Sequence, residues 1–114
     1  MHDVDAAVRF YTEFLDFDLE EHMGTRFAVL AYGDLQLWLS GPGSSAMRAP
    51  PGGSQPEPGG WNRLVIELPD IEPVISKLLA AHVPFRSAIL SGPGGRQVVC
   101  EDPSGNPIEL FQPA

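Results

Sequence analysis

The sequence predicts an α+β fold made of two βαβββ modules, of which the first lacks its opening strand. Three observations support this: a helical apolar stripe occurs in each half, three strand-like runs follow each stripe, and a Gly- and Pro-rich segment, residues 41–60, separates the halves. A chain of 114 residues is too short for two independent cores. We therefore expect a single domain, with module one at residues 1–40, a linker at 41–60 and module two at 61–114.

Each predicted helix begins at an aspartate. Asp3 can cap the first helix, and Asp16 can end it in a left-handed conformation. Asp70 is expected to cap the second helix, with Pro73 in the first turn, where its missing N–H does little harm. Apolar residues recur at helical spacing in both segments. They are Val4, Ala7, Val8, Tyr11 and Leu15 in the first, and Ile71, Val74, Ile75, Leu78 and Leu79 in the second.

Strand-like runs follow both helices, and one run also precedes the second helix. The last run of each half aligns closely, 35–38 with 108–111, and each follows a turn that contains Gly. This match indicates an internal duplication. No run precedes the first helix, so we expect that one strand is missing. The predicted strands are 17–23, 26–32 and 35–40 in the first half, and 62–68, 85–89, 96–101 and 108–112 in the second.

Composition excludes several classes of function. The net charge is -8, with 15 acidic residues against seven Lys and Arg, so nucleic acid and anionic membrane surfaces are unlikely partners because they would be repelled. The single cysteine, Cys100, excludes an intramolecular disulfide and is expected to be a small buried residue. No apolar run approaches the roughly 20 residues that span a bilayer, and no secretion signal is visible. A cytoplasmic location is expected.

The run Glu-Asp-Pro-Ser-Gly-Asn-Pro-Ile-Glu-Leu-Phe at 101–111 resembles the closing hairpin of the glyoxalase, bleomycin-resistance and extradiol dioxygenase proteins, the vicinal oxygen chelate superfamily. Asp3 with Phe10-Tyr11 resembles the start of their first helix, and 68–71 with 80–85 resembles their second. The resemblance implies that the modules form curved sheets around one ligand cavity. It also implies a homodimer, which the exposed edge left by the missing strand favours.

The resemblance implies four metal-ligand positions, on the first and last strand of each module. The first falls on the missing strand, and the others fall on Gln36, Arg63 and Glu109. Gln36 is a weak neutral ligand, and a guanidinium repels a metal ion. No metal or other cofactor is therefore expected, and the alternative is a divalent metal held by Glu109 and Gln36. His22 is not expected to bind a metal either, because alternation along strand 17–23 should place it on a polar face with Asp18 and Glu20.

Strand alternation predicts which side chains line the cavity. The aliphatic residues of 35–40 and 108–112 should face the helices, leaving the opposite face to aromatic and polar groups, as is typical of organic-ligand pockets. Arg63 and Glu109 are expected to pair, either as a structural ion pair or as a ligand-recognising one. Trp38 is expected to contact a ligand or to fill space between the modules. The predicted ligand-binding residues are Gln36, Trp38, Arg63, Glu67, Glu109 and Phe111, with Val65 beside them.

The leading hypothesis is a metal-independent small-molecule binding protein of the bleomycin-resistance type, which sequesters a cationic or aromatic ligand and has no catalytic residue. Three observations favour it: the acidic net charge, the aromatic residues on the cavity face, and the lack of suitable side chains at the metal-ligand positions. The alternative is a metal-dependent glyoxalase-like lyase or dioxygenase whose first-strand ligand is absent from this chain. A third hypothesis is a degenerate module that serves only as an interaction domain.

Overall fold

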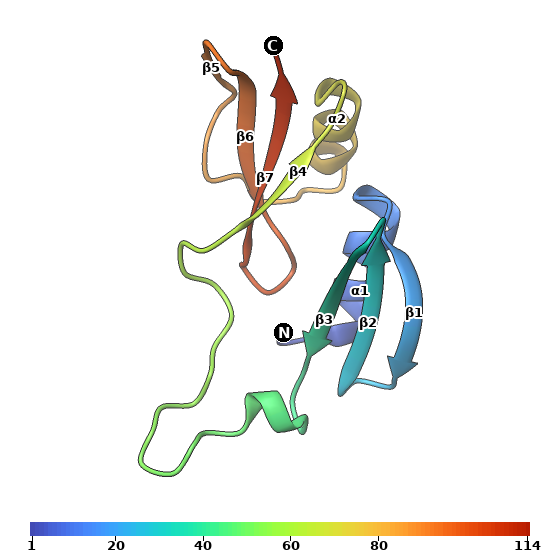
Figure 1. Cartoon of the computed structure of the whole chain (residues 1–114), viewed down its shortest axis with the longest axis vertical. Helices are drawn as coiled ribbons and strands as arrows, with labels where there is room; N and C mark the ends of the chain where they lie inside the picture. The colour runs from blue at the N-terminus through green and yellow to red at the C-terminus, as the bar shows by residue number, and fades with distance from the viewer. The chain divides into compact units, whose positions relative to one another are not determined.

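The computed structural model describes all residues, 1–114, and confirms the α+β fold. The chain forms two compact units, Met1–Pro58 and Gly59–Ala114, and the boundary falls inside the predicted linker. Each unit contains one α-helix and one sheet (Figure 1). No helix is long and apolar enough to cross a membrane.

Unit 1 contains helix α1 (Val4–Phe14) and an antiparallel sheet of order β1-β2-β3, with β1 at Asp18–Met23, β2 at Phe27–Tyr32 and β3 at Leu35–Ser40. Both predicted helix ends are confirmed. Asp3 Oδ1 accepts a 3.0 Å hydrogen bond from the Ala6 N–H, and Asp16 has a φ of 59°. The helix covers one face of the sheet (Figure 1), and the apolar stripe is buried there. The helix residues in this core are Val4, Ala7, Val8, Phe10 and Tyr11.

A β-bulge in β1 changes which side chains share a face. Leu19 pairs with Leu30, but the next pair is Glu21 with Val29, so Glu20 is an extra residue. His22 consequently pairs with the buried Ala28, and its Nε2 lies 2.8 Å from Asp5 Oδ1 on α1. The expectation that His22 shares a face with Asp18 and Glu20 was therefore wrong, because one inserted residue reverses the alternation beyond it.

Unit 2 has the complete βαβββ order. Its elements are β4 (Leu64–Glu67), α2 (Glu72–Ala80), β5 (Leu90–Gly92), β6 (Gly95–Glu101) and β7 (Pro107–Pro113). The strand order is β4-β7-β6-β5, and β4 runs parallel to β7 while the other pairs are antiparallel. Unit 1 has no strand equivalent to β4, so β3 is an edge strand, as expected from the comparison of the two halves.

Two local expectations in unit 2 need correction. Helix α2 begins at Glu72, and its N-cap residue is Ile71, one residue later than predicted. Asp70 Oδ1 still accepts a 3.1 Å hydrogen bond from the Glu72 N–H. Residues 85–89 form only one bridge, between Phe85 and Cys100, and the strand itself is Leu90–Gly92. The Arg86 N–H still donates to the Val99 carbonyl, but the Val99 N–H donates to the Ser87 hydroxyl instead of to a backbone carbonyl.

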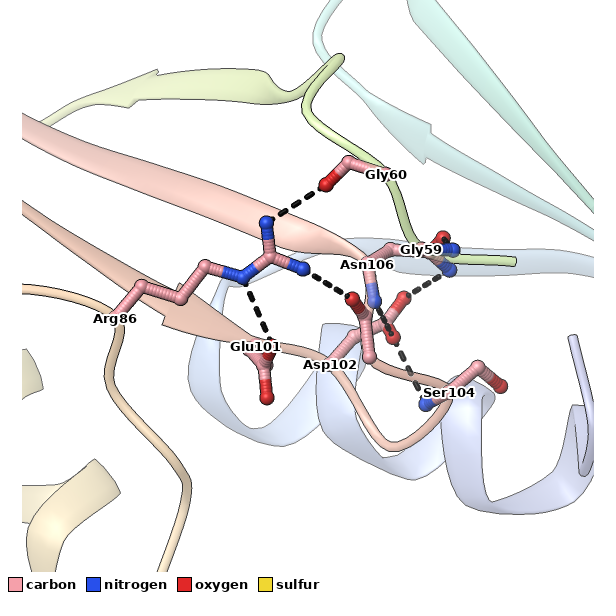
Figure 2. A network of polar contacts seen from close by, with 8 residues as sticks. Gly59, Gly60, Arg86, Glu101, Asp102, Ser104 and Asn106 are labelled. Atoms are coloured by element: carbon pink, nitrogen blue, oxygen red, sulfur yellow. Dashed lines mark hydrogen bonds and ion pairs between the residues drawn. The ribbon is translucent and has the colours of Figure 1, made fainter.

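The loop between β6 and β7 is built around the buried carboxylate of Asp102 (Figure 2). Its Oδ1 accepts from the backbone N–H groups of Ser104 and Asn106, each at 2.9 Å, and its Oδ2 accepts from the Asn106 side-chain amide at 2.9 Å. Gly105 has a φ of 82°, a region that favours glycine. The motif residues of 102–106 thus fix the turn that leads into β7.

Arg86 joins this loop to the first residues of unit 2, as Figure 2 shows. Its Nε donates to Glu101 Oε2 at 2.8 Å, while the two Nη atoms donate to the carbonyls of Gly60 and Gly105 at 2.7 and 2.8 Å. The guanidinium carbon also lies 5.1 Å from the centre of the Trp61 ring. The planar donor fork can reach three acceptors at once, so Arg86 holds the chain entering β4 against the β6–β7 loop.

Candidate functional site

The face of the unit 1 sheet opposite α1 carries the aromatic side chain predicted to meet a ligand. Trp38 pairs with Val29 across the sheet, and its side chain is 65% exposed. The Phe27 ring meets the indole edge-on at 5.4 Å between centroids. On the other face Leu39 is buried, as predicted, but Leu35, the first residue of the strand, is 46% exposed. A largely exposed indole backed by a second ring offers a surface for stacking.

A chain of polar contacts extends from Trp38 along this face. The indole N–H donates to Gln36 Oε1 at 3.3 Å, and the Gln36 amide donates to Glu20 Oε1 at 3.4 Å. Asp18 pairs with Ala31, which pairs with Gln36, so alternation from Asp18 places Glu20 on the same face as Gln36. The predicted residues Gln36 and Trp38 therefore lie together, and Glu20 joins them.

A cavity of about 370 Å³ adjoins the Trp38 ring within unit 1, in the size range of small-ligand sites. Of the predicted ligand-binding residues only Trp38 lines it. Phe27 could have been found from the sequence, because it lies two residues before Val29, the partner of Trp38, and therefore on the same face of the sheet. The remaining positions come from strand ends and from the segment treated as a linker. The lining residues are Met23, Arg26, Phe27, Trp38, Ser40, Ser44, Ser45 and Ala46.

The start of the predicted linker folds back to form part of this cavity. After β3, the Gly41 N–H donates to the Arg26 carbonyl at 2.8 Å, and Ser44 donates through both its N–H and its hydroxyl to the Gly41 carbonyl. A single-turn 3₁₀ helix, η1 (Ser45–Met47), follows. Gly41 is required because a Cβ there would lie 2.5 Å from both Thr25 O and Val4 Cγ2. The first residues of the predicted linker are therefore structured and belong to unit 1.

The predicted site residues of unit 2 lie on the face of its sheet that is opposite the buried aliphatic set. Arg63 Nη2 lies 2.8 Å from Glu109 Oε1, so the expected ion pair is present. The Glu109 side chain is 10% exposed and that of Arg63 is 34% exposed. Glu67 and Phe111 are paired across β4 and β7, while Val65, opposite Glu109, is exposed. Arg63, Glu67, Glu109 and Phe111 therefore share one region of unit 2.

The residues at the family's metal positions do not suit a divalent cation. Glu109 is the one carboxylate among them, and Arg63 engages it directly. A cation cannot approach that carboxylate without displacing a guanidinium, and the guanidinium offers no lone pair in return. No group of three or more His, Cys, Asp and Glu side chains is arranged to hold a metal ion.

Cys100 is the remaining side chain with nucleophilic potential. It is fully buried, and this burial raises the pKa of its thiol to about 12. A thiol in that state is protonated at neutral pH and cannot act as a thiolate. The expectation of a small buried core residue is confirmed.

Comparison with known proteins agrees with the fold and the hairpin motif. Residues 1–110 match the profile of the "Glyoxalase/Bleomycin resistance protein/Dioxygenase superfamily". No curated protein sequence matches significantly. Similar solved structures include a lactoylglutathione lyase from Agrobacterium tumefaciens, with 21% identity and a TM-score of 0.73, covering 96% of this chain and 85% of that one.

Two further similar structures come from actinomycete sources. TioX from Micromonospora sp. ML1 has 20% identity and a TM-score of 0.74, over 100% of this chain and 93% of its own. TnmS3, an antibiotic binding protein from Streptomyces sp. CB03234, has 25% identity and a TM-score of 0.69, over 100% and 89%. The likenesses below a quarter identity establish the shared fold, and the profile match covers nearly the whole sequence. This chain therefore belongs to the glyoxalase/bleomycin resistance protein/dioxygenase superfamily.

Proposed function

We propose that this protein binds an aromatic small molecule without a metal and performs no chemistry on it, in the manner of the bleomycin-resistance branch. The observation that carries the proposal is Trp38, an exposed indole that stands at the wall of a cavity of about 370 Å³. Large aromatic side chains are costly to leave in water, and a stacked guest would remove that cost. The likeness to the antibiotic binding protein TnmS3 supports the same class of function.

The enzymatic alternative, a metal-dependent lyase or dioxygenase, has less support. It needs Glu109 as a ligand, and that carboxylate is engaged by Arg63. The likeness to a lactoylglutathione lyase is one of fold. Metal analysis of purified protein separates the two proposals, because one tightly bound divalent ion per chain would overturn the metal-free proposal.

Binding is tested by calorimetry with three probes that share one ring system: naphthamide, naphthoate and naphthylmethylammonium. We expect at least one to bind, and Trp38→Ala to weaken that binding about tenfold through the loss of stacking and burial. Trp61→Ala is the matched control, since Trp61 is 80% exposed, contacts Arg86 and does not line the cavity. No binding of any probe, or equal losses in both variants, would contradict the proposal.

We also propose that the protein pairs as a homodimer through the free edge of β3. This strand pairs with β2 on one side and with no strand on the other, where the Met1 ammonium donates to the Ser40 carbonyl at its end. The equivalent strand of unit 2, β7, has neighbouring strands on both sides. Free edges present unpaired backbone groups that favour association. Light scattering across a concentration series tests this, and a monomer at the highest concentration would count against it.

A further inference from the structure

The cavity beside Trp38 differs in charge from the rest of the molecule. The chain has a net charge of -8, yet none of the eight lining residues is acidic. Arg26 is their one charged member, and the others are apolar, aromatic or hydroxyl-bearing. The lining thus combines one cation with the hydroxyls of Ser40, Ser44 and Ser45.

The Arg26 guanidinium is fixed at the cavity without being neutralised. Its Nη2 donates to the Gly43 carbonyl at 3.1 Å, which positions the group by a neutral acceptor. The ion pairs of the chain join His22 to Asp5, Arg63 to Glu109, Arg86 to Glu101 and Arg96 to Glu72, and none involves Arg26. A guanidinium has five N–H donors, so most of those of Arg26 remain available to a guest.

The backbone around Arg26 holds this arrangement in place. The Arg26 N–H donates to the Met23 carbonyl and its own carbonyl accepts from Gly41, so the residue is tied to the β1–β2 turn and to the turn after β3. Gly43, with a φ of 86°, lies against the Arg26 side chain, where a Cβ would come within 3.7 Å of Nε. Arg26 is therefore held by backbone hydrogen bonds between the β1–β2 turn and the turn after β3, and both turns contribute residues to the cavity.

We propose that the guest of this cavity is an aromatic molecule that carries an anionic group, with its ring against Trp38 and Phe27 and its acid group against Arg26. The inference rests on the proposed binding function and adds the ligand's charge. A planar carboxylate matches the donor fork of a guanidinium. The hydroxyls of Ser40 and Ser45 can donate to the same group, whereas that of Ser44 already donates to the Gly41 carbonyl. An ammonium group in that place would meet a like charge and no acidic side chain.

This proposal reverses the cationic half of the expectation drawn from net charge. Net charge governs long-range attraction, but a contact at the site is decided by the groups that line it. The acidic residues of β1, among them Glu20 and Glu21, do not line the cavity.

The test compares the three naphthyl probes on the full-length protein by calorimetry. We expect naphthoate to bind about tenfold more tightly than naphthamide, the difference that a charge-assisted hydrogen bond at a partly exposed site provides. Arg26→Gln should abolish that preference, while Arg26→Lys should keep part of it. Arg9→Gln, which removes the same charge from the exposed face of α1, should leave the preference intact.

The outcomes separate this inference from the proposal on which it rests. If naphthoate and naphthamide bind equally and both respond to Trp38→Ala, the aromatic-binding function stands and the anionic preference is refuted. Tighter binding of naphthylmethylammonium would also refute it. If no probe binds, the proposed function itself fails. Loss of naphthoate preference in Arg9→Gln as well as in Arg26→Gln would assign the effect to net charge and overturn the site.

Discussion

The Asp102 carboxylate provides a sharp test of how the hairpin motif stabilises unit 2. Replacing it by alanine removes the acceptor of three hydrogen bonds, two from backbone N–H groups and one from the Asn106 amide. Bonds to a charged acceptor contribute roughly 1.5–3 kcal/mol each when counted singly, and bonds that share one acceptor are not additive. We therefore expect Asp102→Ala to lower the free energy of unfolding by about 3 kcal/mol.

The atoms involved allow a finer prediction for Asp102→Asn. Both backbone N–H groups donate to Oδ1, so an asparagine whose oxygen takes that position keeps them and loses only the Oδ2 contact. The expected cost is about 1 kcal/mol, because two amide N–H₂ groups then face each other. Adding Asn106→Asp restores a complementary pair, and the double variant should regain most of that loss.

Urea denaturation followed by circular dichroism gives all three values, with a second probe, the fluorescence of Trp61, to establish that one transition is observed. Total stabilities of domains this size are about 5–15 kcal/mol, so a loss of about 3 kcal/mol is measurable. Equal losses in Asp102→Asn and Asp102→Ala would refute the assigned roles of Oδ1 and Oδ2. A loss below about 1 kcal/mol in Asp102→Ala would refute the structural importance of the loop.

Three further predictions concern single residues. Gly41→Ala should cost about 2 kcal/mol in unfolding free energy, since its Cβ would overlap Thr25 O and Val4 Cγ2. Arg63→Met should cost about 1 kcal/mol, because it leaves a nearly buried Glu109 carboxylate without its cation, and Arg63→Met with Glu109→Gln should recover it. The raised pKa of Cys100 means that its contribution to stability is complete below pH 9 and is lost as pH rises toward about 12, so Cys100→Ala should flatten this alkaline decline.

Each of these predictions has its own control. Gly92→Ala is matched to Gly41→Ala because a Cβ at Gly92 meets nothing within 4 Å, and equal effects at both sites would contradict the packing explanation. Failure of the double variant to recover the Arg63→Met loss would show that the guanidinium acts through packing instead of charge. Rapid reaction of Cys100 with a thiol reagent in the native protein at pH 8 would contradict its burial.

The elements that depend on local pattern could be predicted from the sequence. The cap at Asp3, the left-handed residue at Asp16 and strand β3 required only helical spacing, alternation and turn chemistry. The Arg63–Glu109 pair followed from strand alternation, because the alternation that buries the aliphatic residues places these two on the other face.

What could not be predicted depends on contacts between distant segments. The bulge at Glu20 leaves no mark in the alternation of β1, since every residue of that strand is exposed, and register there is set by pairing with β2. The match between the halves predicts a strand at 85–89, but the Ser87 hydroxyl accepts a hydrogen bond from a backbone N–H of β6. Arg26 became a cavity residue only because the turn after β3 folds back over it.

The protein is acidic overall, but its cavity carries one positive charge, and these two charges act on a ligand at different distances. At physiological ionic strength the screening length is about 8 Å, so carboxylates elsewhere on the surface act on a ligand's approach and hardly on its bound contacts. Two unit charges about 4 Å apart interact by ~1 kcal/mol in water and by about 4 kcal/mol at the effective dielectric near a protein surface. An un-neutralised guanidinium that touches the ligand therefore outweighs distant acids in setting affinity. The surrounding negative charge slows the arrival of an anion without reversing the preference, so the charge of Arg26 is the better guide to the ligand than the -8 of the chain.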